Sequence, residues 1–180
     1  MSRPLNYFLT TTRLGFHHWT LEDLPLALAL WTNPEVTQMI GGPLSPEQVK
    51  EKLVREIELQ ASSGIQYWPI FLRTTGEPVG CAGLRPYQKT TDIYELGFHL
   101  LPASWNQGLA QEAASAVIGY AFDRLGARGL FAGHHPENAA SRRVLEKLGF
   151  RYTHDELYPA TGLMHPSYLL EAPGRRHPSP

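Results

Sequence analysis

The sequence predicts an α/β fold, of the α+β kind, in which a mixed, largely antiparallel sheet of about seven strands is flanked by about four helices. Three observations lead to this prediction. The 180 residues, 42% of them hydrophobic, are enough for one domain with a substantial core. Several segments place apolar residues at helical spacing. Short β-like runs separate them, and three such runs follow one another directly in the middle of the chain.

The first third of the chain predicts one strand and two helices. A β-leaning run covers residues 12–19, and the segment 21–25 then has a proline in the first turn of a helix. We expect this helix to end at Asn33-Pro34, because the residue before a proline disfavours helical backbone. Ser45-Pro46-Glu47-Gln48 supplies an N-cap, a proline at the first helical position and an acidic first turn. The second helix should end near Ser63-Gly64.

The remaining elements alternate between strands and helices. The three consecutive β-like runs, which predict an antiparallel meander, are residues 67–73, 78–85 and 92–100. Apolar residues at helical spacing predict a helix over residues 108–125 and another over 138–148, the second closed by Gly149. Further strands are predicted at residues 129–135, 150–158 and 164–171.

Composition and charge exclude several classes of protein. Lys and Arg number 16 against 17 Asp and Glu, so the net charge of −1 gives no general positive field for nucleic acid or an anionic membrane. No stretch approaches the roughly 20 apolar residues of a membrane helix, and the N-terminus lacks an apolar signal core. A single cysteine, Cys81, fits a reducing compartment. We therefore expect a cytoplasmic protein that binds neither nucleic acid nor a membrane.

The domain organisation follows from the same survey. No internal repeat is present, and the predicted elements run without a linker from the first strand to the last. We expect residues 1–171 to form a single domain. The ending A-P-G-R-R-H-P-S-P over residues 172–180 cannot bury apolar surface, so we expect a disordered C-terminal tail.

The turn before the helix at 108–125 is a candidate anion site. It reads W-N-Q-G-L-A from Trp105 to Ala110. The first N–H groups of a helix have no partner within the helix and lie at the positive end of its dipole, so they bind a pyrophosphate without any lysine. Taken alone, the same turn also fits an ordinary connection between a strand and a helix.

Three separated signatures extend this reading to the whole chain. They are the strand Y-E-L-G-F-H-L from Tyr94 to Leu100, the turn W-x-x-G-x-A just described, and N-A-A-S-R-R-V-L-E-K-L-G-F from Asn138 to Phe150. Through them the chain resembles the GNAT acetyltransferase superfamily, and within it the RimJ/RimL-like branch of ribosomal-protein N-acetyltransferases. The likeness also covers the N-terminal segments Thr12-Arg13-Leu14 and W-T-L-E-D over residues 19–23. Members carry a Q/R-x-x-G-x-G/A turn that wraps the pyrophosphate of acetyl-CoA, and tryptophan in its first position is usual in this branch. The resemblance implies the GNAT fold, whose sheet splays open between the fourth and fifth strands.

The resemblance also implies how acetyl-CoA, the acyl donor, would be bound. The pyrophosphate would accept hydrogen bonds from the backbone N–H groups of Gln107, Gly108, Leu109, Ala110 and Gln111. The pantetheine arm would behave as an added strand and pair with the main chain of Phe98, His99, Leu100 and Leu101. That pairing would aim the thioester carbonyl at a backbone N–H, with His99 as the candidate. Asn138 matches the family asparagine whose side chain binds the cofactor, and Ser141 is a further cofactor contact.

Glu95 is the candidate catalytic base. The reaction needs a group, or a water held by one, to take the proton of the attacking amine. Residues 95, 97 and 99 share one face of the predicted strand, and that face should look into the substrate cleft. A partly desolvated glutamate would have a raised pKa and could act through one water molecule. The alternative role of Glu95 is a surface ion pair at the end of a strand.

Ser141 is the second candidate catalytic residue. Many superfamily members place a tyrosine in the last helix to protonate the departing thiolate, and the matching position here is Leu145. In the RimJ/RimL-like branch a serine three residues after the asparagine can approach the sulfur, which is the place of Ser141. One hydrogen bond to a developing thiolate stabilises the transition state. An ordinary serine in the first helical turn is the alternative.

The eight histidines do not predict a metal site. His17-His18 and His134-His135 are adjacent pairs, which point to opposite faces if their segments are strands. We therefore expect no metal. His99 and His135 are left open either as proton carriers near the cleft or as packed, hydrogen-bonded rings. Cys81 lies within an apolar run and is expected to be a packed side chain.

The resemblance thus implies an N-acetyltransferase that moves an acetyl group from acetyl-CoA to a primary amine, with a protein N-terminal α-amine as first choice. Alternatives are a small amine, such as an aminoglycoside, polyamine or amino acid, and a noncatalytic acyl-CoA-binding module, which Leu145 supports. The acceptor pocket is expected to draw on residues 39–44, 87–91 and 158–165. The sequence settles neither the acceptor nor the use of other acyl groups, and it leaves a homodimer open.

Overall fold

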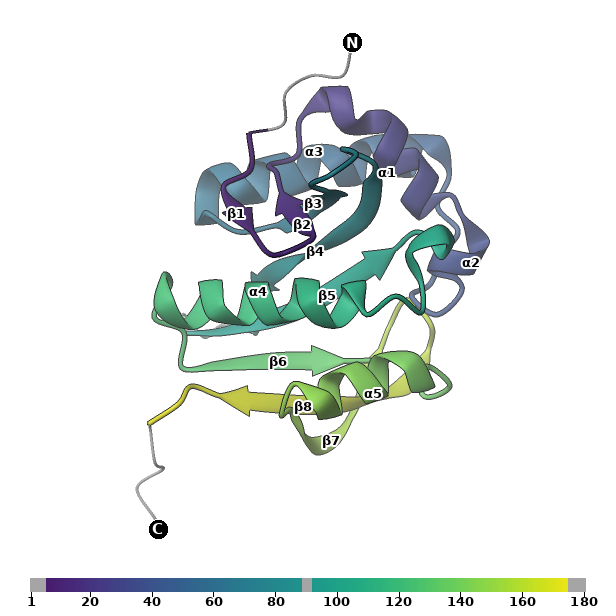
Figure 1. The fold of residues 1–180 in the computed structure, drawn as a ribbon. Coiled ribbons are helices and arrows are strands. Elements are labelled where there is room, and N and C mark those ends of the chain that lie inside the picture. Colours follow the sequence, from purple (N-terminus) through teal and green to yellow (C-terminus); the bar gives the residue numbers. More distant parts are fainter. Residues whose placement is uncertain (1–5, 89–91, 175–180) are drawn as a thin grey trace.

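The computed structural model describes residues 6–88 and 92–174 (Figure 1). Its strands are β1 (Leu9–Thr10), β2 (Leu14–Phe16), β3 (Tyr67–Leu72), β4 (Pro78–Pro86), β5 (Ile93–Leu100), β6 (Gly129–Gly133), β7 (Arg151–Tyr158) and β8 (Leu163–Glu171). Its α-helices are α1 (Leu24–Trp31), α2 (Pro34–Thr37), α3 (Pro46–Ser63), α4 (Leu109–Asp123) and α5 (Ala139–Lys147). Short 3-10 helices cover Leu21–Asp23 and Pro102–Ser104. This is the predicted α/β class.

One mixed sheet of eight strands runs through the described residues in the order β1-β2-β3-β4-β5-β6-β8-β7. The predicted meander is β3, β4 and β5, paired antiparallel. Strands β5 and β6 are parallel, and their pairing stops at Glu95↔Phe131 although β5 continues to Leu100. The two strands therefore diverge beyond Glu95. They are the fourth and fifth strands of the predicted order, so the predicted place of the splay is confirmed.

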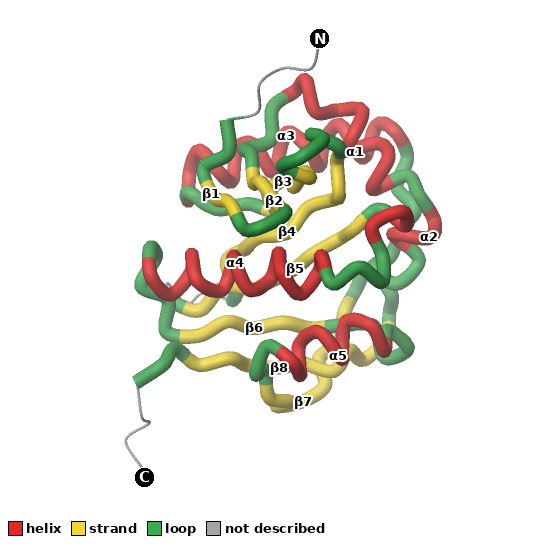
Figure 2. Tube along the Cα trace, in the orientation of Figure 1, coloured by secondary structure: helices red, strands yellow, loops and turns green. Residues whose placement is uncertain are grey.

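Helices cover both faces of the sheet (Figure 2). Helices α4 and α5 lie over one face, where Val117, Leu130 and Leu145 belong to a buried cluster. Helices α1 and α3 lie over the other, where Trp31 and Leu53 pack in a second cluster. Strands β3 and β4 contribute to both clusters, so their residues form nearly continuous buried runs instead of alternating.

The predicted helix signals correspond to observed caps. The Ser45 hydroxyl accepts a hydrogen bond from the Gln48 N–H, and the Gln48 side-chain oxygen accepts one from the Ser45 N–H, which forms a capping box. Gly64 ends α3 in the left-handed conformation, at φ +70°. The first helix ends before Asn33, as predicted. Asn33 also caps a new helical turn, because its side chain accepts from the Glu35 N–H and Pro34 takes the first position.

The sequence predicted about seven strands and about four helices. The described residues contain one more of each, eight strands and five α-helices. The additional elements, β1 and α2, span two and four residues, which is too short for a periodic pattern. The strand predicted over 12–19 is reduced to β2. Of the predicted tail, residues 175–180 lie outside the described part of the chain, and the Ala172 N–H donates to the Arg128 carbonyl. No helix in the described residues is long and apolar enough to cross a bilayer.

Candidate active site

A cleft of about 1010 Å³ opens where β5 and β6 diverge. This volume lies at the upper end of the range for small-molecule sites, about 300–1,000 Å³. Its lining comes from the middle and end of β5, the starts of α4 and α5, the segment after α1 and the β7–β8 hairpin. Of the predicted acceptor segments, residues 39–42, 44, 87–88, 158–160 and 165 line it, and residues 89–91 lie outside the described residues.

The turn before α4 presents backbone donors to this cleft. Asn106 and Gly108 have positive φ values of +59° and +74°, which asparagine and glycine tolerate best. The first intrahelical bond runs from the Glu112 N–H to the Gly108 carbonyl, so the N–H groups of residues 109–111 precede the helical ladder. Gly108, Leu109, Ala110 and Gln111 all line the cleft. The geometry is that of an anion site at a helix N-terminus.

An ionic clamp that the sequence analysis missed holds this turn. The Arg13 Nε donates to the Glu112 carboxylate at 2.6 Å, and the Arg13 Nη1 donates to the Gln107 carbonyl at 2.9 Å. The Thr11 hydroxyl donates to the same carboxylate at 2.5 Å. Thr12-Arg13-Leu14 lies in the N-terminal region that the resemblance covers, but Glu112 is 99 residues away from Arg13, so the sequence did not reveal the contact.

The backbone of β5 offers its free edge to the cleft at alternate residues. The Leu101 N–H donates to the carbonyl of Val79 in β4 at 2.9 Å. Alternate residues of a strand point their N–H and C=O groups to the same neighbour, so those of His99 also face β4. The backbone groups of Phe98 and Leu100 face the gap, where the Trp105 indole N–H reaches the Leu100 carbonyl at 2.9 Å. The pairing positions in the gap are therefore Phe98 and Leu100, and the His99 N–H is directed away from it.

Glu95 lies where the two strands separate, on the face that includes Gly97 and His99. Its carboxylate accepts a hydrogen bond of 3.3 Å from the Tyr67 hydroxyl. Burial raises the pKa of Glu95, and the nearby Arg85 guanidinium and the Tyr67 hydroxyl oppose this shift only in part. A carboxyl group with a raised pKa in a cleft is a candidate general base.

A buried charged network behind Glu95 was not predicted. Arg85 forms an ion pair with Glu56 of α3, which is only 3% exposed. The Lys52 Nζ lies 3.8 Å from the Glu56 carboxylate and 4.6 Å from the centroid of the Trp31 ring. Burial, with Arg85 nearby, lowers the pKa of Lys52 to about 8. Nothing in the local pattern of α3 and β4 signals that these side chains meet.

His99 is a packed, neutral ring. Its Nδ1 accepts a hydrogen bond of 3.4 Å from the Trp31 indole, and burial lowers the pKa of His99 to about 3. This ring does not become charged near neutral pH. Burial likewise raises the pKa of the neighbouring Cys81 thiol to about 12, as suits a packed side chain. His135 lines the cleft, where its ring lies 5.5 Å from that of His165.

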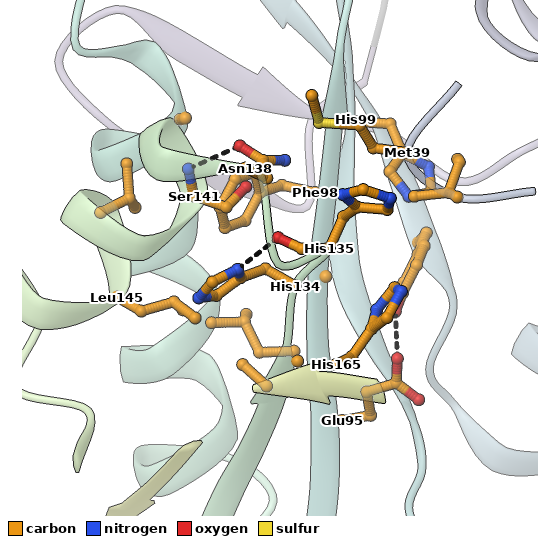
Figure 3. A pocket seen from close by; sticks show the side chains of 18 of the residues that line it. Met39, Glu95, Phe98, His99, His134, His135, Asn138, Ser141, Leu145 and His165 are labelled. Atoms are coloured by element: carbon orange, nitrogen blue, oxygen red, sulfur yellow. Dashed lines mark hydrogen bonds between the residues drawn. The ribbon is translucent and has the colours of Figure 1, made fainter. Parts of the chain in front are cut away.

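Asn138 is the N-cap of α5, Ser141 lies in its first turn and Leu145 lies in its last turn (Figure 3). The Asn138 carbonyl oxygen accepts from the Ser141 N–H at 3.0 Å, which caps the helix and leaves the amide nitrogen of Asn138 as a donor. All three residues line the cleft, and Leu145 is also part of the core. Figure 3 shows them on one side of the pocket and Glu95 on the other.

The described residues contain no group of three or more His, Cys, Asp or Glu side chains that could hold a metal ion. The two adjacent histidine pairs lie just beyond the ends of β2 and β6, in irregular segments instead of strands. The two ring nitrogens of His134 form hydrogen bonds, Nδ1 with the His135 carbonyl oxygen at 2.8 Å and Nε2 with the Tyr168 hydroxyl at 3.3 Å.

Comparison with known proteins agrees with this geometry. Residues 13–151 match the family model described as an acetyltransferase (GNAT) domain. An N-acetyltransferase of Bacillus subtilis, YoaA, is 32% identical over 148 residues, covering 79% of this chain and 82% of the relative. The FsC-acetyl coenzyme A-N(2)-transacetylase of Aspergillus fumigatus is 31% identical over 160 residues, covering 83% and 66%. The structure of RimL, a ribosomal L7/L12 alpha-N-protein acetyltransferase in complex with coenzyme A, superimposes with a TM-score of 0.78 at 17% identity, covering 92% of this chain and 98% of RimL.

Proposed function

The chain belongs to the acetyltransferase (GNAT) family and is an acyltransferase, and from this premise we propose that it transfers the acetyl group of acetyl-CoA to a protein N-terminal α-amine. The observation that carries the proposal is the convergence, in one cleft, of the α4 N-terminus, the splayed edge of β5 and the partly buried carboxyl group of Glu95. The similarity of the fold to RimL, which is named for acetylation of a ribosomal protein, supports the protein N-terminus as acceptor.

The residues present fit acetyl-CoA. The N–H groups that precede the α4 ladder suit its pyrophosphate, and the amide nitrogen of Asn138 is a donor at the start of α5. In the proposed complex, Gln107, Gly108, Leu109, Ala110 and Gln111 bind the pyrophosphate. The Phe98–Leu101 segment binds the pantetheine arm along its open edge, chiefly through Phe98 and Leu100. Acetyl-CoA supplies the acetyl thioester that is transferred.

Glu95 and Ser141 carry the proposed proton and charge transfers. The acceptor amine must be neutral to attack, so its proton passes to the Glu95 carboxylate, directly or through one water molecule. The raised pKa of Glu95 makes this carboxylate a better proton acceptor than an exposed one. Ser141, on the opposite side of the cleft, donates a hydrogen bond to the sulfur as the thiolate departs. Leu145 cannot make that donation.

A thiol-release assay tests this function. The purified protein is incubated with acetyl-CoA and two panels of acceptors, one of short peptides with free N-termini and one of aminoglycosides, polyamines and amino acids. We expect thiol release with peptides, with mass spectrometry placing one acetyl group on the N-terminal residue. Release with small amines only would reject the protein N-terminus as acceptor. Tight acetyl-CoA binding without turnover on either panel would instead support a noncatalytic acyl-CoA-binding module.

A further inference from the structure

Three residues on neighbouring strands form a row across the sheet below Glu95. Tyr67 of β3 is paired with Gly83 of β4, and Gly83 is paired with Gly97 of β5. Residues paired across a sheet project on the same face. The two glycines leave that face bare, so the Tyr67 side chain can lie across β4 and reach β5.

The fit of Tyr67 against Gly97 is close. A Cβ atom at Gly97 would lie 2.2 Å from the Tyr67 hydroxyl oxygen and 2.4 Å from its Cζ, well inside contact distance. A Cβ atom at Gly83 would lie 2.0 Å from the Gln66 carbonyl oxygen. Only glycine at position 97 therefore lets the tyrosine hydroxyl occupy its place beside Glu95.

Contacts to the backbone N–H and to the ring of Tyr67 hold this residue in place. It is 3% exposed, and its N–H donates to the Glu56 carboxylate at 3.0 Å. The Arg85 guanidinium lies over the Tyr67 ring at 4.1 Å from the centroid and is itself paired with Glu56. The ring of His99 meets the other side of the tyrosine edge to face at 5.6 Å. These contacts leave the Tyr67 hydroxyl directed at Glu95.

We propose that Tyr67 is a positioning residue that holds the Glu95 carboxylate in the orientation needed to accept the amine proton, and that Gly97 is glycine to admit it. The role assigned to Glu95 rests on the proposed function. The Tyr67 hydroxyl donates to the Glu95 carboxylate at 3.3 Å, and a dashed line ends on the Glu95 carboxylate in Figure 3. Burial raises the pKa of Tyr67 well above its ordinary value, so the hydroxyl keeps its proton and acts as a constant donor.

The direction of the effect follows from the groups that face Glu95. Burial and Glu156 of β7 raise the pKa of Glu95, and Arg85 of β4, the Tyr67 hydroxyl and Lys52 of α3 lower it. Tyr87 and Tyr158 lie close enough for their own pKa values to be raised by Glu95. A donor stabilises the charged carboxylate, so removing the Tyr67 hydroxyl should raise the pKa of Glu95 further.

The test is a carbon-13 NMR titration of the Glu95 carboxyl group, assigned by the signal that disappears in Glu95→Gln. We expect Tyr67→Phe to raise the Glu95 midpoint by about half a pH unit to one unit, as for loss of one hydrogen bond to a charged group. Gly97→Ala should raise it similarly, and should add nothing to Tyr67→Phe because both remove the same contact. The control is Tyr120→Phe, which removes a hydroxyl from α4 outside the cleft.

An unchanged midpoint in folded Tyr67→Phe would overturn the proposal, and this result does not depend on Gly97→Ala folding. The titration needs no turnover, so it is informative even if no amine is acetylated. If turnover is measured, the acidic limb of the pH profile of kcat/KM in Tyr67→Phe should shift to higher pH by the same amount as the Glu95 midpoint. An activity that keeps its acidic limb in Glu95→Gln would instead count against Glu95 as the base, whatever the NMR titration gives.

Discussion

Burial shifts the pKa values of two side chains of the cleft in opposite directions. Burial raises the pKa of Glu95, because the neutral carboxyl group is favoured over the charged one. Burial lowers the pKa of His99, four residues further along the same strand, because the neutral ring is favoured over the charged one. Of these two groups only Glu95 has a pKa displaced toward neutrality, so the geometry separates a candidate base from a packing residue. Both were candidates for proton transfer in the sequence, where burial and partners are not visible.

Glu95→Gln tests the base directly. The carboxylate must be ionised to accept a proton, so activity should fall as pH drops through its raised pKa. The amide cannot accept the proton, and kcat/KM should decrease about 10²- to 10⁴-fold at neutral pH, with loss of the acidic limb. The measurement is a pH profile beside an acetyl-CoA titration, in which affinity should be unchanged. Glu58→Gln, on the exposed face of α3, is the matched control.

Ser141→Ala should affect a different step. The hydroxyl meets the sulfur only as the carbon–sulfur bond breaks, so kcat should fall about ten- to a thousandfold while acetyl-CoA affinity barely changes. The helix cap survives because Asn138 bonds the backbone N–H of residue 141 and not its hydroxyl. The measurement is kcat and the KM for acetyl-CoA by steady-state kinetics, with Ser63→Ala of α3 as the control variant. An undiminished kcat would make Ser141 an ordinary serine of the first helical turn.

At the scale of elements, the hairpin of β1 and β2 is tied to the turn before α4. Arg13 connects them through both Glu112 and the Gln107 carbonyl, and its side chain is 46% exposed, so the clamp stands at the edge of the predicted pyrophosphate site. The interaction fixes a loop whose N–H groups must be aligned before an anion arrives. Alignment in advance reduces the entropy lost on binding.

Arg13→Ala should therefore weaken cofactor binding without changing chemistry. We expect the KM for acetyl-CoA to rise roughly three- to thirtyfold, as for a lost charge-assisted contact, with kcat nearly constant. Arg128→Ala is the matched control, because Arg128 forms a comparable pair with Asp92 at 3.1 Å and does not line the cleft. Equal KM values for the two variants would show that the clamp does not order the turn.

The elements that could be predicted are those whose signals are local. Helix α3 was delimited by its capping box and Gly64, and β3 to β5 by turn residues between apolar runs. The short elements β1 and α2 carry no periodicity. The contacts of Tyr67 with Glu95 and of Arg85 with Glu56 join residues 28 and 29 positions apart on different elements. Such pairs depend on strand register and side-chain packing, which a single sequence does not specify.

At the scale of the whole molecule, one sheet carries both buried clusters and opens at the parallel pair of β5 and β6. The clusters share strands β3 and β4, which supports the proposal that residues 1–171 fold as one domain. In the proposed function, the acyl donor and the acceptor occupy two different sides of this opening. The α4 and α5 side suits the acyl donor, and the side lined by Glu95, Tyr87 and Tyr158 suits the acceptor.

We propose that acetyl-CoA occupies the gap between β5 and β6 with its pyrophosphate on the α4 N-terminus. Hydrogen–deuterium exchange with and without saturating acetyl-CoA tests it most directly, because the N–H groups that precede the α4 ladder have no intrahelical partner to slow their exchange. We predict protection of residues 98–111 and of the start of α5, with α3 unchanged as the internal reference. Protection confined to other segments, or none at saturation, would contradict the account.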